Sequence, residues 1–160
     1  MITARYHLAD LDAAVDAAVA TLAADRAIAR LWAHDHTLFG PDPTECANRM
    51  GWTDIAERVS AQWDDLGADA AAIVDVADHV IVMGMGGSSL FPEVLAATFG
   101  RTAGFPELHV IDTTDPAAIA ALADRCPPER TFHVASSKSG STLETRSHLE
   151  FFLARSGDPS

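Results

Sequence analysis

Lysine and cysteine are both rare in this sequence of 160 residues, which has one lysine, Lys138, and two cysteines, Cys46 and Cys126. The two cysteines lie in different segments and lack the close spacing of a metal-binding motif. We therefore expect free, buried thiols in a reducing cytoplasm and no metal site.

Positive charge is also scarce, because 23 acidic residues outnumber 11 basic ones and the net charge is −12. No basic cluster offsets this excess, which argues against a nucleic acid or an anionic membrane as partner. No apolar run approaches the ~20 residues that span a bilayer. Residues 1–10 are polar and lack the basic and apolar regions of a signal peptide, so a cytoplasmic location is expected.

The chain begins with a segment of helical character, residues 1–77. Apolar side chains there recur at steps of three and four, and they predict one amphipathic helix over residues 8–32. The residues of this predicted apolar stripe are Leu8, Leu11, Val15, Val19 and Leu22.

From residue 78 to residue 160 the pattern changes to strand, loop and helix, repeated three times. Apolar runs at 80–83, 108–111 and 131–135 predict strands, and the helices after them are expected at 90–99, 116–125 and 143–155. This order is typical of right-handed βαβ units. The predicted fold is α/β, a three-layer α/β/α parallel sheet of flavodoxin-like type. It is expected to be incomplete, because three strands leave an edge uncovered.

The loop after the first predicted strand, residues 84–89, reads Gly-Met-Gly-Gly-Ser-Ser. Glycines allow a sharp turn and a close approach to a ligand, and Ser88 and Ser89 stand at a predicted helix start that favours an anion. Close packing of strand and helix is the alternative explanation. The loop also half-matches a dinucleotide fingerprint, with Ser89 replacing the third glycine and Asp112 ending the next strand.

The loop after the third predicted strand, residues 136–142, holds five hydroxyl residues, one glycine and Lys138, without any acid. Hydroxyl groups and helix-start amides are the donors that a phosphate dianion needs, and a lysine adds a compact positive charge. A solvated serine-rich turn is the alternative, and the spacing excludes a Walker A loop. A nicotinamide cofactor would not need this second loop. The two loops together therefore favour a small phosphorylated ligand at the carboxyl edge of the sheet.

These loops resemble a known family. Residues 84–90 with Pro92, followed by residues 137–145 (Ser-Lys-Ser-Gly-Ser-Thr-Leu-Glu-Thr), resemble the sugar-isomerase (SIS) fold of phosphoglucose isomerases. Residues 36–52 are similar to the isomerase half of bifunctional transaldolase/phosphoglucose isomerases. The similarity extends over nearly the whole chain.

The resemblance implies an aldose–ketose isomerase that interconverts glucose 6-phosphate and fructose 6-phosphate, a step of glycolysis and gluconeogenesis, without a cofactor. The implied substrate-binding residues come from both loops; they are Gly87, Ser88, Ser137, Lys138, Ser139 and Thr142. Glu144 is expected to support the catalytic groups without contacting the substrate itself. Its alternative role is that of an ordinary acid in the first turn of a helix.

No catalytic residue is expected in this chain, because the glutamate, histidine, arginine and lysine that catalyse the reaction in the family come from later sequence. We interpret the chain as an N-terminal fragment that is inactive alone. His109 and His133 fall inside predicted strands and are expected to be core histidines. A sugar-phosphate-sensing regulatory module of the same fold is the alternative. The expected partner is a sugar phosphate, and the full-length protein is expected to be a homodimer or a fusion to transaldolase.

Overall fold

The computed structural model describes residues 9–157, and the chain divides into two compact units after Trp63. Each unit is described by itself. Among the described residues, no helix is both long and apolar enough to cross a membrane. The domain boundary expected between residues 77 and 78 stays a prediction.

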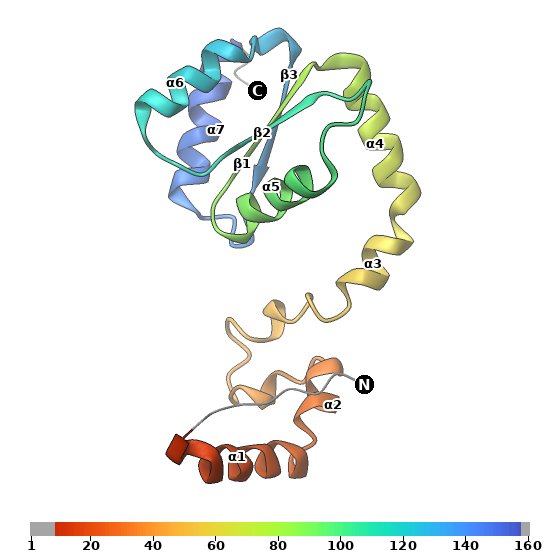
Figure 1. Ribbon diagram of the computed structural model, residues 1–160, viewed down its shortest axis with the longest axis vertical. Coiled ribbons are helices and arrows are strands. Elements are labelled where there is room, and N and C mark those ends of the chain that lie inside the picture. The colour runs from red at the N-terminus through yellow and green to blue at the C-terminus, as the bar shows by residue number, and fades with distance from the viewer. Residues whose placement is uncertain (1–8, 158–160) are drawn as a thin grey trace. The chain divides into compact units, whose positions relative to one another are not determined.

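The first unit is helical, as Figure 1 shows in red to yellow. Its elements are the 3-10 helices η1 (Ala9–Leu11), η2 (His36–Leu38) and η3 (Ala47–Arg49) and the α-helices α1 (Asp12–Ala24), α2 (Ala27–Trp32) and α3 (Ile55–Ala61). None of the residues of α1 is buried. The expected stripe residues Val15, Val19 and Leu22 on α1 are exposed, as is Leu11 in η1. Leu8 lies outside the described residues.

The single helix expected over residues 8–32 is wrong, because the chain breaks it at Arg26. This residue adopts a left-handed backbone conformation with φ of 53°. The guanidinium of Arg30 forms an ion pair with Asp25 on one side of the break and with Asp35 on the other. Hydrogen bonds from Thr37 and from Arg30 lower the pKa of the Asp35 carboxyl to about 2. Local polar contacts thus accompany a break in the helix that the apolar spacing predicts.

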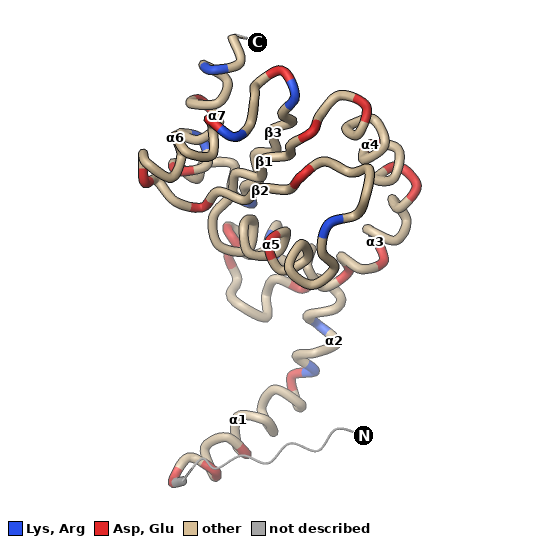
Figure 2. Tube along the Cα trace, turned by 45° about the horizontal axis from the view of Figure 1, so that its top comes forward, with Lys and Arg blue, Asp and Glu red and all other residues tan. Residues whose placement is uncertain are grey.

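The second unit contains every strand of the described chain. Its elements are α4 (Trp63–Val76), β1 (His79–Gly84), α5 (Gly87–Phe99), β2 (Glu107–Ile111), α6 (Pro116–Arg125), the 3-10 helix η4 (Pro128–Arg130), β3 (Thr131–Ser136) and α7 (Leu143–Ser156). The strands form one parallel sheet in the order β2-β1-β3, with β1 in the middle. The predicted α/β fold is confirmed. Figure 2 shows acidic residues distributed over the helices, with arginines between them.

The three strands start in register around Asp78. Its backbone N–H donates to the carbonyl of Arg130 at 2.8 Å, and its own carbonyl accepts from the N–H of Glu107 at 2.8 Å. The Arg130 guanidinium donates hydrogen bonds to both carboxylate oxygens of Asp78, at 2.8 and 3.0 Å. These bonds lower the pKa of that carboxyl. At the first ladder position, His79 is therefore paired with Glu107 on β2 and with Thr131 on β3.

Helices cover the sheet on both faces, with α5 on one and α6 and α7 on the other (Figure 1). The side chains of β1 alternate between these faces, as expected for a strand. Ile81 and Met83 of β1 join the main core under α6 and α7, whose other buried members are Ile111, Ala123, Cys126 and Phe152.

Two glycines shape the turn from β1 into α5. A Cβ on Gly84 would come within 2.9 Å of backbone atoms of Ser88, so the start of α5 packs directly against the end of the strand. Gly86 has φ of 57° and ψ of −125°, a conformation that residues with a Cβ rarely adopt. The helix can therefore begin at Gly87, immediately beside the sheet edge.

Truncation of Phe152 is expected to destabilise the second unit by about 3–5 kcal/mol, because its ring is 4% exposed and fills the core under α7. Phe151→Ala is the matched control, since that ring is 39% exposed. Urea unfolding followed by circular dichroism measures both variants. Equal losses of stability would contradict this description of the core.

Gly84→Ala is expected to cost about 1–3 kcal/mol, because the new methyl group would overlap the backbone of Ser88. Gly87→Ala is the matched control, since a Cβ there meets no atom within 4 Å. The free energies of unfolding of the two variants distinguish a need for close approach from a general need for flexibility in this loop. A stable Gly84→Ala variant would show that the turn relaxes easily.

Candidate functional site

The two polar loops singled out by the sequence leave the same edge of the sheet from neighbouring strands. Gly84 at the end of β1 is directly paired with Ser136 at the end of β3. The glycine loop begins after the first of these residues and the hydroxyl loop after the second. Because parallel strands carry their carboxyl ends to one edge, the two loops start side by side.

Gly87 and Ser88, from the glycine loop, line one hollow together with Ser136. The hollow has a volume of about 400 Å³, and its other walls are Val82, Phe91, Pro92 and Val134. Ser88 is half-buried at the start of α5. The N–H groups of Ser88 and Ser89 donate to the carbonyls of Met85 and Gly86, each at 3.2 Å, so an anion in the hollow would have to compete with these bonds.

The hydroxyl loop is held in shape by its own side chains. The Ser137 hydroxyl lies 3.0 Å from the Thr142 hydroxyl and accepts the N–H of Gly140 at 3.1 Å. The Ser139 hydroxyl accepts the N–H of Ser141 at 3.2 Å and lies 3.5 Å from the Thr142 hydroxyl. Three of the predicted phosphate-binding hydroxyls, those of Ser137, Ser139 and Thr142, thus form one cluster.

This cluster sits at the start of α7, where Thr142 is the N-cap residue. The Thr142 side chain accepts no hydrogen bond from the first turn of the helix, because its hydroxyl faces Ser137 instead. The amides of that turn are therefore left to another acceptor. A dianion bound here would receive hydroxyl and amide donors together.

The two charged residues of this loop and helix start differ in exposure. Lys138 is exposed, and within the part of the chain that the structure describes its ammonium makes no ion pair. Glu144 is half-buried in the first turn of α7. Its role toward the catalytic groups and its role toward the helix dipole both stay open as predictions.

Two contacts connect α5 and α7, the helices that follow the two loops, to the loop after β2. The Ser89 hydroxyl is almost fully buried and lies 3.0 Å from the Gly86 carbonyl oxygen and 3.4 Å from a carboxylate oxygen of Asp112. On α7, Nε2 of His148 donates to the carbonyl of Thr113 at 2.9 Å. His148 was not anticipated from the sequence, since nothing near it in the chain signals its partner.

The strand histidines lie away from both loops. His133 points from β3 against the ring of Phe152, with ring centroids 5.2 Å apart, and burial lowers the pKa of its imidazole. His109 is 8% exposed within β2. Neither loop contains a histidine. The described geometry therefore supplies anion donors at this edge of the sheet and no imidazole base within the loops.

Comparison with known proteins shows which family the chain resembles. The sequence model of the phosphoglucose isomerase family matches residues 13–155. A glucose-6-phosphate isomerase of Acaryochloris marina is 34% identical over 144 residues, which are 88% of this chain and 26% of that protein. One of Thermus thermophilus is 34% identical over 109 residues, covering 68% of this chain and 25% of that protein.

A solved structure shares the fold. It is the crystal structure of a hypothetical protein from Thermus thermophilus, with a TM-score of 0.62 and 26% identity, over 90% of this chain and 32% of that one. The chain thus spans about a quarter of the two isomerases and a third of this structure. The match of the family over most of the chain, on the fold just described, shows that the chain belongs to the phosphoglucose isomerase family.

Proposed function

We propose that the chain binds the phosphate group of a hexose 6-phosphate at its two loops and forms part of a glucose-6-phosphate isomerase. The observation that carries this proposal is the cluster of hydroxyls at residues 137–142, placed at a helix start beside the glycine loop. The family supplies the substrate class. The predicted ligands are Gly87, Ser88, Ser137, Lys138, Ser139 and Thr142.

Local donors must hold the anion, because the chain as a whole has a net charge of −12 and repels it. Hydroxyls and amides bind a dianion through short, charge-assisted hydrogen bonds. Lys138 is exposed at the edge of this set, so its ammonium adds attraction that solvent screens. The hydroxyl pair Ser137 and Thr142 therefore contributes most of the proposed affinity.

Isomerisation itself is proposed to need residues beyond these 160. Moving a proton between two sugar carbons requires a base in contact with substrate and a donor for the developing oxyanion. Glu144 is the acid nearest in sequence to the hydroxyl cluster, and its proposed role is to support such groups. We also propose that the full-length protein is a homodimer or a fusion to transaldolase, and that it is cytoplasmic.

Removal of both hydroxyls in Ser137→Ala/Thr142→Ala is expected to weaken binding of 6-phosphogluconate by about 100-fold or more, since each hydrogen bond to a charged group contributes about 1.5–3 kcal/mol. Titration calorimetry on the 160-residue chain measures it. Ser147→Ala is the matched control, because the Ser147 hydroxyl lies on α7, outside the hydroxyl cluster, and donates to the Leu143 carbonyl. Lys138→Ala should weaken binding only a few-fold.

The same titration separates the rival ligand classes. Glucose 6-phosphate and 6-phosphogluconate are expected to bind, and NAD is not. Binding of NAD without either sugar phosphate would reject the proposal. An unchanged affinity in the double variant, with sugar phosphate still bound, would reject only the assignment of the loop.

Turnover of fructose 6-phosphate by the purified 160-residue chain is expected to be undetectable, because the proposed base and oxyanion donor are absent from the loops. A coupled assay with glucose-6-phosphate dehydrogenase measures it, and calorimetric binding of the same substrate shows that the site is intact. A normal enzyme rate would overturn the proposal that catalysis needs further residues. Sugar-phosphate binding by a complete natural protein that lacks turnover would instead favour the sensing module.

A further inference from the structure

A group of metal-ligating side chains lies at the opposite end of β1 from the two loops. His79 is the first residue of β1, His109 lies on β2, and Cys126 follows the last residue of α6. His79 pairs with Glu107 and Ile81 pairs with His109, so both histidines project to the sheet face that α6 covers. Five residues of extended strand separate His79 from Gly84, which amounts to about 16 Å.

The ligand atoms are already close together. Nδ1 of His79 lies 3.1 Å from Nε2 of His109. One ring nitrogen of each histidine and the Cys126 sulfur all lie within 4.8 Å of one another. A tetrahedral zinc ion with Zn–N near 2.0–2.1 Å and Zn–S near 2.3 Å separates its ligand atoms by about 3.3–3.5 Å. Small side-chain adjustments therefore suffice to enclose an ion.

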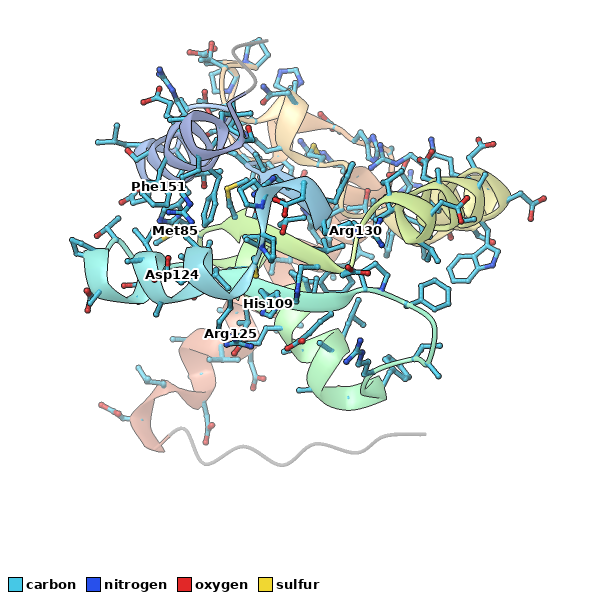
Figure 3. The ribbon with its side chains drawn as sticks, turned by 90° about the horizontal axis from the view of Figure 1, so that it is seen from above. Met85, His109, Asp124, Arg125, Arg130 and Phe151 are labelled. Carbon is cyan, nitrogen blue, oxygen red and sulfur yellow. The ribbon has the colours of Figure 1, made fainter. Side chains whose placement is uncertain are left out.

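Glu107 lies beside these three residues on the same face of the sheet. One of its carboxylate oxygens lies 4.0 Å from Nε2 of His109 and 3.3 Å from the guanidinium of Arg125. Figure 3 shows Arg125 beside His109. A hollow of about 350 Å³ is lined by His79 and Glu107 among others.

We propose that His79, His109, Cys126 and Glu107 bind one divalent metal ion of the zinc type, which links β1, β2 and the end of α6. Two imidazoles, one thiolate and one carboxylate are a ligand set suited to Zn²⁺. One thiolate and one carboxylate balance the two charges of the ion. The site lies at the end of β1 opposite the two loops, so the ion is structural and stabilises the packing of α6 on the sheet.

A metal ion of this type binds neutral imidazoles and a thiolate, so the Cys126 thiol must lose its proton when the ion binds. Binding therefore releases a proton. The alternative is a His79–His109 hydrogen bond beside an unreactive buried thiol.

The test uses the 160-residue chain, stripped with EDTA and titrated first with Co²⁺ and then with Zn²⁺. One Co²⁺ per chain is expected, with a thiolate-to-metal charge-transfer band in the near ultraviolet that Zn²⁺ abolishes by displacement. Stoichiometric Zn²⁺ should also raise the midpoint of thermal unfolding. Metal binding without the thiolate band, or no binding, would overturn the proposal.

Variants locate the site within the chain. Cys126→Ser should abolish the band and weaken Zn²⁺ binding by at least about tenfold. Cys46→Ser is the matched control and should retain both, since that cysteine lies in the first unit. If Cys126→Ser loses its circular dichroism signal, the half-buried His79→Gln replaces it, with His133→Gln as its control. Equal affinity in a variant and its control would refute the assignment.

Discussion

The pairing of β1 with a parallel neighbour on each side is the constraint on which the rest of the second unit depends. It begins at Asp78, whose backbone bonds to Arg130 and Glu107 start both ladders at the same level. It ends where Gly84 lies opposite Ser136. Because both loops emerge from this last pair, the register of the sheet decides that the glycine turn and the hydroxyl cluster share one edge.

Local sequence signals predicted the second unit well. The three apolar runs became β1, β2 and β3 with one residue added at one or both ends. Helix α6 starts at Pro116, whose fixed φ suits a first helical turn. The Asp115 side chain accepts the N–H of Ala117 there and caps the helix. The first unit was predicted less well, because the break at Arg26 depends on ion pairs of Arg30 that helical periodicity does not contain.

The composition of the hydroxyl loop was visible in the sequence, and the clustering of its side chains was not. Contacts such as Ser89 with Asp112 and His148 with Thr113 join residues 23 and 35 positions apart. They follow from strand order, which no local pattern gives. The same reason explains why a cysteine without a motif partner reaches two histidines: Cys126 meets His79 and His109 only after α6 folds back over the sheet.

The central position of β1 also determines how its backbone meets solvent. In a parallel sheet the amides of a strand point alternately to its two neighbours, and β1 has a neighbour on each side. Successive amides of β1 are therefore all shielded, whereas in β2 and β3 only those directed toward β1 are bonded within the described sheet. Deuterium uptake would consequently be slow along the whole of β1 and alternate between slow and fast along its neighbours.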